Sequence, residues 1–307
     1  MTSTSVLRIG TRGSRLALAQ SGQIGARLSA IIGVPYELVT IRTAGDDLAQ
    51  PLTQIGGTGV FVSAVRDALL AGTVDLAVHS LKDLPTGGAP NISLAAVPER
   101  EDPSDALVAR DGLTLATLPA GSRVGTGSPR RAAQLTHHRD DLEIVPIRGN
   151  VDTRVGLVAS GDLDAVVLAV AGLRRLGRAE LISEILDDDV MLPAPAQGAL
   201  GVECRLEDRQ SAWFASALAR LDDPEARAEI TAERSLLSSL EAGCSAPVGA
   251  HAVVTGHELR LSAVAISPDG TARFGGTRTG HSSDAARIGQ QLAAELLADG
   301  AAAALSR

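Results

Sequence analysis

The feature of this 307-residue chain that most constrains its fold is the alternation of strand-like and helix-like segments through its first two thirds. Short apolar runs such as 74–79 and 164–170 are separated by segments such as 61–71, where apolar residues recur at helical spacing. Strands that alternate with helices predict parallel sheets. Ligands of such sheets bind at the carboxyl ends of the strands, so functional residues are expected in the turns that follow them.

The last third of the chain has a different pattern. Residues 224–241 form a strongly helical run, with Pro224 near its start and Gly243 beyond its end, where these residue types favour helix termini. A hairpin is predicted over 251–266 and a final helix over 283–297. This order predicts a small α+β domain, and the Ala-rich tail that follows the final helix, 301–304, is expected to be a frayed end.

Composition and charge exclude several classes of function. The net charge is −8 and the pI about 5.3, so the overall field repels nucleic acid and anionic membranes. Aromatic residues make up 2% of the chain, too few for the stacking platforms that bind single-stranded bases. We find no signal-peptide pattern and no apolar run near the roughly 20 residues of a membrane span, so a cytoplasmic location is expected.

Glycine and arginine recur at three predicted strand-to-helix junctions, which are 9–15, 125–131 and 147–154. In the second junction Ser128 fits a helix N-cap and Pro129 the first helical position. Two arginines in that first turn oppose the helix dipole, and this conflict favours an anionic ligand over an exposed charged turn. Because arginine forks bind carboxylates with two hydrogen bonds, the three junctions predict a small, carboxylate-rich polyanion.

Two other interpretations of these junctions fit the sequence less well. The run 125–131 is close to a dinucleotide-binding motif, but Arg130 stands where that motif needs its third glycine for close packing of helix on strand. Nicotinamide dinucleotide binding is therefore disfavoured. A periplasmic-type module that holds a small anion without chemistry is a second alternative, which the lack of a signal peptide and the loop around Cys244 both count against.

Lys82 is the one lysine among the 28 basic residues, and it directly precedes Asp83 at the end of a predicted strand. Chance in an arginine-biased chain would explain a lone lysine, and a structural ion pair or helix cap would explain the aspartate. As a functional group, a carboxylate among many cations stays ionised, which suits it to stabilising a developing positive charge.

The two cysteines, Cys204 and Cys244, do not form a disulfide framework. Cys244 follows the predicted helix on a glycine-flanked loop, whereas Cys204 lies in an apolar stretch and better fits the usual fate of a buried, inert thiol. No Cys and His residues have the spacing of metal ligands, so no metal is expected.

Several stretches of the chain, among them the junctions and the segments around Asp83 and Cys244 described above, resemble the porphobilinogen deaminase family, also called hydroxymethylbilane synthases. The resemblance runs in order along nearly the whole chain, through the stretches 8–20, 77–85, 99–103, 125–131, 148–154, 168–177, 192–205 and 229–249. It implies a transferase that joins four porphobilinogens head to tail, releases ammonia from each, and frees the linear tetrapyrrole hydroxymethylbilane. It also implies a dipyrromethane cofactor, itself made from two porphobilinogens and held by a thioether bond to a cysteine.

The resemblance implies a fold of two α/β domains like the halves of type 2 periplasmic binding proteins, followed by a small α+β domain that carries the cofactor cysteine. We predict domain 1 over 1–102 with 199–222, domain 2 over 103–198, and domain 3 over 223–307. The implied partner is porphobilinogen, with no nucleic acid and no membrane, and the implied oligomeric state is a monomer.

The family's functional residues are carried over position by position. Cys244 matches the cofactor cysteine and Asp83 the catalytic aspartate. The positions that match cofactor-binding residues are Ser80, Lys82, Asp83, Thr126, Ser128, Arg130, Arg131, Arg148, Gly149 and Arg154. The positions that match substrate-binding residues are Arg12, Ser14, Arg148, Arg154, Arg175 and Gln197. Phe61 matches the lid, while Gln54 and Thr58 stand where many relatives have lid lysines, so this chain lacks that cationic contact with substrate.

Overall fold

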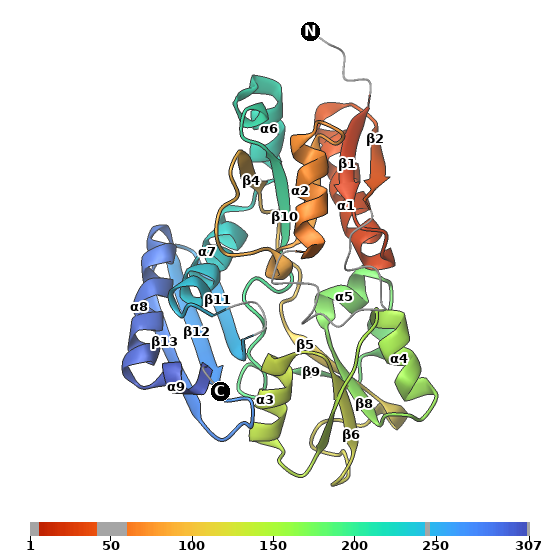
Figure 1. Ribbon diagram of the computed structural model, residues 1–307, viewed down its shortest axis with the longest axis vertical. Helices are drawn as coiled ribbons and strands as arrows, with labels where there is room; N and C mark the ends of the chain where they lie inside the picture. Colours follow the sequence, from red (N-terminus) through yellow and green to blue (C-terminus); the bar gives the residue numbers. More distant parts are fainter. Residues whose placement is uncertain (1–5, 42–59, 243–245, 306–307) are drawn as a thin grey trace. The chain divides into compact units, whose positions relative to one another are not determined.

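The computed structural model describes residues 6–41, 60–242 and 246–305 (Figure 1). Contacts divide the chain into two compact units: unit 1 is 1–100 with 199–227, and unit 2 is 101–198 with 228–307. Unit 1 contains one five-stranded sheet, and unit 2 contains a second five-stranded sheet and a three-stranded one. This architecture confirms the predicted fold class of two α/β domains and a small α+β domain.

The sheet of unit 1 has the strand order β2-β1-β3-β10-β4. Its strands are β1 (Leu7–Thr11), β2 (Tyr36–Thr40), β3 (Leu76–Ser80), β4 (Ile92–Ala96) and β10 (Leu200–Arg205). The first three are mutually parallel, and β10 runs antiparallel between β3 and β4. Its helices are α1 (Arg15–Ile32), α2 (Val60–Leu70) and α6 (Ala212–Leu221), and its 3-10 turns are η2 (Leu81–Asp83) and η5 (Asp208–Gln210).

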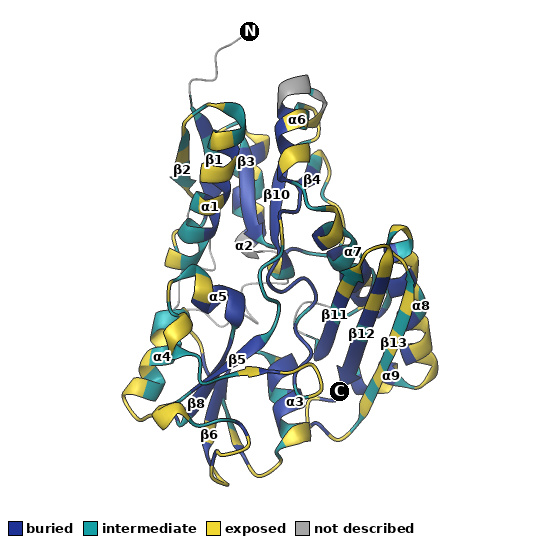
Figure 2. Ribbon diagram, turned by 180° about the vertical axis from the view of Figure 1, so that it is seen from behind, coloured by how far each residue is buried: buried dark blue, intermediate teal, exposed yellow. Residues whose placement is uncertain are grey.

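Alternate residues of these strands meet different helices, which is why the strands are apolar on both faces. Leu7 and Ile9 belong to the core that also contains buried residues of α1 and α6. Ala77 belongs to a separate core with Val65 and Leu69 of α2. Helices thus cover both faces of the sheet, and its central strands β3 and β10 are buried along most of their length (Figure 2).

The first sheet of unit 2 has the order β7-β6-β8-β5-β9. Its strands are β5 (Asp105–Ala109), β6 (Arg123–Thr126), β7 (Glu143–Pro146), β8 (Ala165–Ala169) and β9 (Glu184–Leu186). Its helices and 3-10 turns are α3 (Pro129–His138), α4 (Val151–Ala159), α5 (Val170–Arg175), η3 (Arg110–Gly112) and η4 (Ala179–Leu181). Strands β6, β7 and β8 are parallel and β5 is antiparallel to both of its neighbours, which repeats the plan of the sheet in unit 1.

The three-stranded sheet is an antiparallel meander, β11-β12-β13. It is built from β11 (Val248–Thr255), β12 (Glu258–Ile266) and β13 (Arg273–His281), with α7 (Pro224–Ser239), η6 (Ser282–Asp284), α8 (Ala285–Ala298) and α9 (Ala301–Leu305). Residues of α7, α8 and α9 share one hydrophobic core with the inward-facing residues of β11 and β12.

Three elements were missed by the sequence patterns, and one expectation was wrong. The missed elements are β9, β13 and α6. Strand β13 is an edge strand whose alternate residues are exposed and which contains three glycines, so its stability comes from pairing with β12 rather than from strand propensity. The tail 301–304 is not frayed: it lies in α9, where Ala301 and Ala304 are buried. The exact boundaries of the three predicted domains stay a prediction.

Candidate functional site

The candidate residues of unit 1 follow two adjacent parallel strands. After β1, Arg12 leads to Ser14, whose side chain caps α1 by accepting a hydrogen bond of 3.2 Å from the backbone N–H of Ala17. After β3, Ser80 leads into η2, which contains Lys82 and Asp83. Because β1 and β3 run parallel side by side, both turns lie at the same edge of the sheet.

Turn η2 is fixed by its backbone and by one buried side chain. Leu81 is fully buried, and its N–H donates to the carbonyl of Ala199 at 3.0 Å, beside the start of β10. The N–H of Leu84 closes the turn on the Leu81 carbonyl at 3.2 Å. Lys82 is half-buried and Asp83 is exposed, so an anchored backbone presents the aspartate to the solvent.

The candidate residues of unit 2 also begin at strand ends. Strand β6 ends at Thr126, whose hydroxyl accepts from the N–H of Ser128 at 3.2 Å. Ser128 caps α3 by accepting from the N–H of Arg131 at 3.4 Å. Gly127 is required where this turn meets the end of β7, because a Cβ there would lie 2.5 Å from the carbonyl oxygen of Ile147. The turns after β6 and β7 are therefore packed directly against each other.

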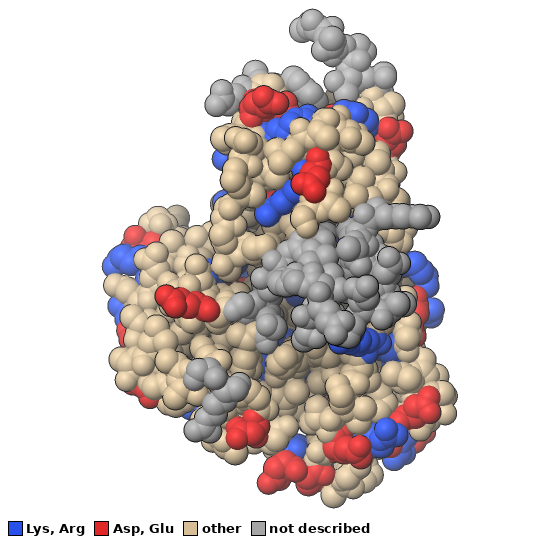
Figure 3. Space-filling view, in the orientation of Figure 1, with Lys and Arg blue, Asp and Glu red and all other residues tan. Residues whose placement is uncertain are grey.

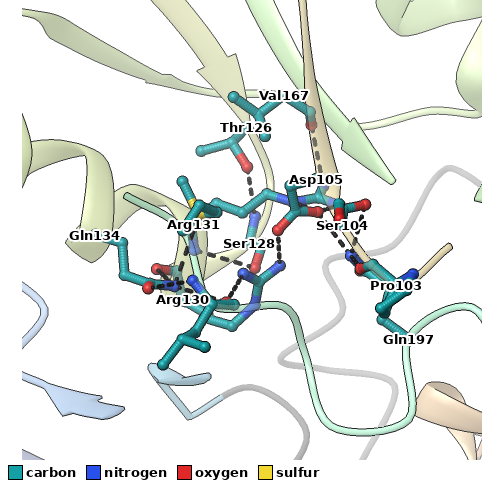
Figure 4. Close-up of polar contacts among 12 residues, drawn as sticks. Pro103, Ser104, Asp105, Thr126, Ser128, Arg130, Arg131, Gln134, Val167 and Gln197 are labelled. Atoms are coloured by element: carbon teal, nitrogen blue, oxygen red, sulfur yellow. Dashed lines mark hydrogen bonds and ion pairs between the residues drawn. The ribbon is translucent and has the colours of Figure 1, made fainter. Parts of the chain in front are cut away.

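A buried carboxylate lies at the centre of the unit 2 site (Figure 4). Asp105, at the start of β5, has no exposed surface. Its Oδ1 accepts from Nε and Nη2 of Arg131 at 3.0 and 2.7 Å, and its Oδ2 lies 2.7 Å from Nη2 of Arg130. The side-chain amide of Gln197 also donates to Oδ1, at 2.8 Å. One carboxylate thus orients two guanidinium groups and one amide.

Both arginines are anchored to the backbone as well as to Asp105. Arg131 donates through Nη1 to the carbonyl of Val167 at 3.0 Å, and Arg130 through Nη1 to that of Leu192 at 2.5 Å. Gln134 holds the same segment by accepting from the N–H of Leu192 and donating to its carbonyl. The guanidinium planes are therefore set by the protein itself before any ligand binds.

The electrostatics of this cluster favour an anion. Burial alone would raise the pKa of Asp105, but the charges of Arg130 and Arg131, with hydrogen bonds from Arg131 and Gln197, outweigh it and lower the pKa well below its usual range. One ionised carboxylate faces two guanidinium groups, so the cluster keeps an excess positive charge. In addition, Nε of Arg130 is buried without a hydrogen-bond partner among the described residues. These groups fit a cofactor that carries carboxylates.

The three remaining candidate arginines of unit 2 differ in exposure. Arg154 is half-buried and donates through Nε to the carbonyl of Gly149 at 2.9 Å, and burial together with the charge of Arg131 lowers its pKa. Arg148 is exposed in the loop before α4. Arg175, at the end of α5, donates through Nη2 to the carbonyl of Gly198 at 2.6 Å. Burial lowers the pKa of Arg175, opposed by the charge of Glu101.

The loop that contains Cys244 joins α7 to β11, and residues 243–245 lie outside the described part of the chain. Glu233 of α7, which is fully buried, joins the described elements on either side of these residues in the sequence. Its Oε1 accepts from the N–H of Ala252 in β11 at 2.8 Å, and its Oε2 from that of Ala196 at 2.6 Å. Ala196 precedes Gln197, so Glu233 connects α7 and β11 to the segment that carries Gln197.

The predicted site residues fall into three sets. In unit 2 the structure brings together Thr126, Ser128, Arg130, Arg131, Gly149, Arg154 and Gln197, with Arg148 in the loop before α4 and Arg175 at the end of α5. In unit 1 it places Arg12, Ser14, Ser80, Lys82 and Asp83 at one sheet edge. Cys244, Gln54 and Thr58 lie outside the described residues, as does the side chain of Phe61.

Sequence patterns missed Asp105 and Glu233. Asp105 lies two residues beyond 99–103, one of the stretches that carried the resemblance, so only its neighbourhood was marked. Glu233 lies within 229–249, another stretch that carried the resemblance, but nothing in the helical pattern of that segment set it apart as a buried anchor. Within 6–41, 60–242 and 246–305, no group of acidic, His or Cys side chains could hold a metal ion. None of the helices in those ranges is long and apolar enough to cross a membrane.

On the face drawn in Figure 3, the described Lys and Arg side chains and the Asp and Glu side chains lie in small mixed groups rather than in one broad basic surface. Cys204, the described cysteine, is buried in β10, and burial raises the pKa of its thiol to about 11. A thiol with so high a pKa is a poor nucleophile at neutral pH, so Cys204 is the inert cysteine that its surroundings predicted.

Comparison with known proteins assigns a family to most of the chain. Residues 7–212 match the family model described as "Porphobilinogen deaminase, dipyromethane cofactor binding domain". Residues 227–298 match "Porphobilinogen deaminase, C-terminal domain". The matched ranges include every described residue of the two site regions.

Curated relatives match over most of their length. The chain is 55% identical to porphobilinogen deaminase 1 of Streptomyces coelicolor, covering 96% of each chain. It is 54% identical to the porphobilinogen deaminase of Acidothermus cellulolyticus, over 97% of this chain and 90% of that protein. It is 53% identical to the enzyme of the same name from Thermobifida fusca, over 97% of this chain and 95% of that protein.

The solved structures that are similar to part of the chain include periplasmic binding proteins. The methionine-binding protein MetQ is 11% identical with a TM-score of 0.46, covering 73% of this chain and 92% of that one. A periplasmic substrate-binding protein of an ABC transporter from Coxiella burnetii is 15% identical with a TM-score of 0.44, covering 72% and 94%.

Proposed function

The chain belongs to the porphobilinogen deaminase family, and from that premise we propose how its residues divide the work of the reaction. Enzymes of this family use a dipyrromethane cofactor and build the linear tetrapyrrole of porphyrin biosynthesis from porphobilinogen, and this chain is one of them. The proposal assigns the chemistry to the turn after β3, the binding of carboxylates to the arginine cluster of unit 2, and the attachment of cofactor to Cys244.

Asp83 is the proposed catalytic residue. Ammonia leaves the aminomethyl group of porphobilinogen and positive charge develops on the pyrrole that remains. An exposed carboxylate on an anchored turn can accept a hydrogen bond from the pyrrole N–H and stabilise that charge. It can also accept the proton that the attacking ring carbon loses when the new bond forms. Lys82, beside it, is the proposed partner for a substrate carboxylate.

The arginine cluster is the proposed carboxylate-binding wall. Each pyrrole ring has an acetate and a propionate group, so cofactor and growing product are polyanions. Asp105 holds Arg130 and Arg131 in fixed planes with an excess positive charge, and Arg148 and Arg154 extend the cationic surface along the next turn. Such preorganised forks bind carboxylates with two parallel hydrogen bonds and lose little entropy on binding. Arg12, Ser14, Arg175 and Gln197 are proposed to contact the incoming substrate.

Cys244 is the proposed attachment point, through a thioether bond to a methylene carbon of dipyrromethane. When bound, the cofactor supplies the free pyrrole carbon to which the first porphobilinogen is joined. The tether requires a cysteine near the arginine cluster, and the hydrogen bonds of Glu233 to Ala196 and Ala252 support that placement. We also propose that the enzyme acts as a cytoplasmic monomer with no nucleic-acid or membrane partner. The net charge of −8 supports the exclusion of nucleic acid.

The intact mass of the protein, purified from cells that make porphobilinogen, tests this assignment. We expect an excess over the polypeptide mass equal to two pyrrole units. Cys244→Ala should lose the excess, whereas the matched control Cys204→Ala should keep it. An excess that survives in Cys244→Ala would contradict the attachment.

Turnover tests Asp83 separately. Asp83→Ala should keep the fold and the bound cofactor but lose at least about 100-fold in kcat, the scale seen when a preorganised charge-stabilising group is removed. Formation of hydroxymethylbilane is followed by the absorbance of the porphyrin that it gives after ring closure and oxidation. Near-normal turnover in Asp83→Ala would remove this residue from the mechanism.

A further inference from the structure

A second buried carboxylate lies in unit 1, outside the residues discussed so far. Glu203 is in β10, the strand between β3 and β4, and is 3% exposed. In the β-ladder it stands opposite Ala77, and Gly201 stands opposite His79. Paired residues of antiparallel strands face the same side of a sheet, so Glu203 and His79 both lie on the side that carries Ala77, which is packed under α2.

Glu203 is held by two partners from different elements. Arg66 of α2 donates through Nε to Oε2 at 2.9 Å and through Nη2 to Oε1 at 2.6 Å, a two-pronged pair. Nε2 of His79 lies 3.3 Å from Oε2. The side chains of Arg66, Glu203 and His79 retain at most 15% of their surface exposed. One carboxylate thus joins a helix and two strands, and we call these three residues the Glu203 network.

Stability alone does not account for the Glu203 network. Burial would raise the pKa of Glu203, but the two hydrogen bonds from Arg66 and the close approach of His79 outweigh it and lower the pKa to about 2, so the group is charged at neutral pH. Removing an ion pair from water costs about as much as the attraction returns, and apolar residues of the same shape are often at least as stabilising. What a buried, two-pronged pair provides and an apolar contact does not is a defined orientation.

The elements that the network joins converge on the turn with Asp83. His79 is followed by Ser80, the last residue of β3, and then by η2. Strand β10 begins at Leu200, opposite Ser80, and Ala199 just before it accepts the N–H of Leu81. The same two strands therefore carry the network in their middle and the turn at their end.

We propose that Glu203 is a positioning residue for catalysis: through Arg66 and His79 it fixes α2 and β3 on β10 and so sets the position of Asp83. This inference rests on the proposed function, because it takes Asp83 as the catalytic group. Geometry of this kind has a measurable effect on rate, since a displacement of about 1 Å at a reacting group can cost on the order of 100-fold.

The first experiment compares Glu203→Gln with a matched control, both as cofactor-loaded enzymes. Asp75→Asn removes another partly buried carboxylate of unit 1, which accepts from the backbone N–H of Arg8 at 2.9 Å and from its Nη2 at 2.7 Å. Asp75 precedes β3, so it lies at the opposite end of that strand from Asp83. We expect kcat to fall about 10- to 100-fold in Glu203→Gln with KM unchanged, and to stay unchanged in Asp75→Asn.

Intact mass shows that both variants are loaded, and circular dichroism that both are folded. Equal kcat values for Glu203→Gln and Asp75→Asn would overturn the proposal. A fall in kcat for Glu203→Gln would support the proposal only if loading is complete, and incomplete loading with normal kcat per loaded enzyme would overturn it. Asp83→Ala remains the separate test of the catalytic assignment, so a failure of one idea is distinguishable from a failure of the other.

The second experiment covers the case in which Glu203→Gln does not fold. Arg66→Met combined with Glu203→Gln removes both charges and leaves no buried guanidinium unpaired, so stability should return toward that of the unmodified enzyme. The proposal expects kcat to remain at least about 10-fold low, because the two-pronged orientation is still missing. Recovery of kcat together with stability would show that the Glu203 network only stabilises the fold.

Discussion

The two five-stranded sheets follow one plan but hold their buried carboxylates at different depths. In each sheet one antiparallel strand pairs with the third of the three parallel strands. This strand is β10, paired with β3, in unit 1, and β5, paired with β8, in unit 2 (Figure 1). Asp105 of β5 stands opposite Ala169, the last residue of β8, whereas Glu203 of β10 stands opposite Ala77 near the start of β3. One carboxylate is therefore at the carboxyl edge of its sheet and the other is deeper.

This difference in depth accompanies a difference in partners. Asp105 is paired with two arginines in the first turn of α3, at the edge where ligands bind. Glu203 is paired with one arginine of α2 and with His79, below the turn that carries Asp83. On the two proposals made above, the same architecture serves two purposes: the carboxylate at the edge organises cations for binding, and the carboxylate in the middle holds a turn in position.

The turns after the strands are also equivalent in the two sheets. Thr11 and Thr126 end the equivalent strands β1 and β6, and Ser14 and Ser128 cap the helices that follow. The turn with Asp83 after β3 corresponds to α5 after β8, which ends at Arg175. Where one unit presents an exposed acid, the other presents a helix that ends in arginines.

The largest effect is expected from Asp105→Asn. The variant leaves two buried guanidinium groups without a negative charge, and breaking a buried pair in this way costs about 3–5 kcal/mol. Thermal and urea unfolding measure the loss. Glu203→Gln should cost less, because it leaves one arginine rather than two; a larger loss in Glu203→Gln than in Asp105→Asn would contradict the comparison.

The second largest effect is a dependence of the unfolding free energy on pH. The pKa of Glu203 is about 2 in the folded protein against 4.5 for an ordinary glutamate, so at neutral pH the fold is about 3 kcal/mol more stable with Glu203 ionised than with the same side chain protonated. Because the folded pKa is the lower one, this stability is complete above pH 4.5 and is lost as pH falls toward 2. Unfolding measured from pH 7 to pH 2 should show the difference between the unmodified protein and Glu203→Gln shrinking over that window. A difference that does not change with pH would contradict the ion pair.

The smallest effect is expected from removing either of the two equivalent helix N-caps. Ser14→Ala and Ser128→Ala each remove one side-chain acceptor from a helix N-terminus, and each should cost about 1 kcal/mol of unfolding free energy. Urea unfolding checks both, with Ser14→Thr and Ser128→Thr as variants that keep the acceptor. A cost confined to one variant would show that the two turns are not equivalent in energy.

Local rules predicted a good part of the local structure around the candidate site residues. Ser128 and Pro129 were recognisable as a cap and a first helical residue, and Lys82 with Asp83 as the end of a buried strand, because these signals depend on immediate neighbours. The carboxylate partners were not predictable in this way. Asp105 and Arg131 are 26 residues apart, and Arg66 and Glu203 are 137 residues apart. Whether these side chains come together depends on which antiparallel strand pairs with the third parallel strand of each sheet.

The sequence by itself therefore determined the class of fold, the family and the residue types at the strand ends, since hydrophobic period, helix caps and charge are properties of short segments. Only the tertiary structure decided that Arg130 and Arg131 share one buried aspartate, that Gln197 joins them, and that Glu203 lies below the turn with Asp83. The physical reason is that an ionised side chain is buried only where opposite charges and hydrogen-bond donors surround it, and here strands distant in the chain supply them.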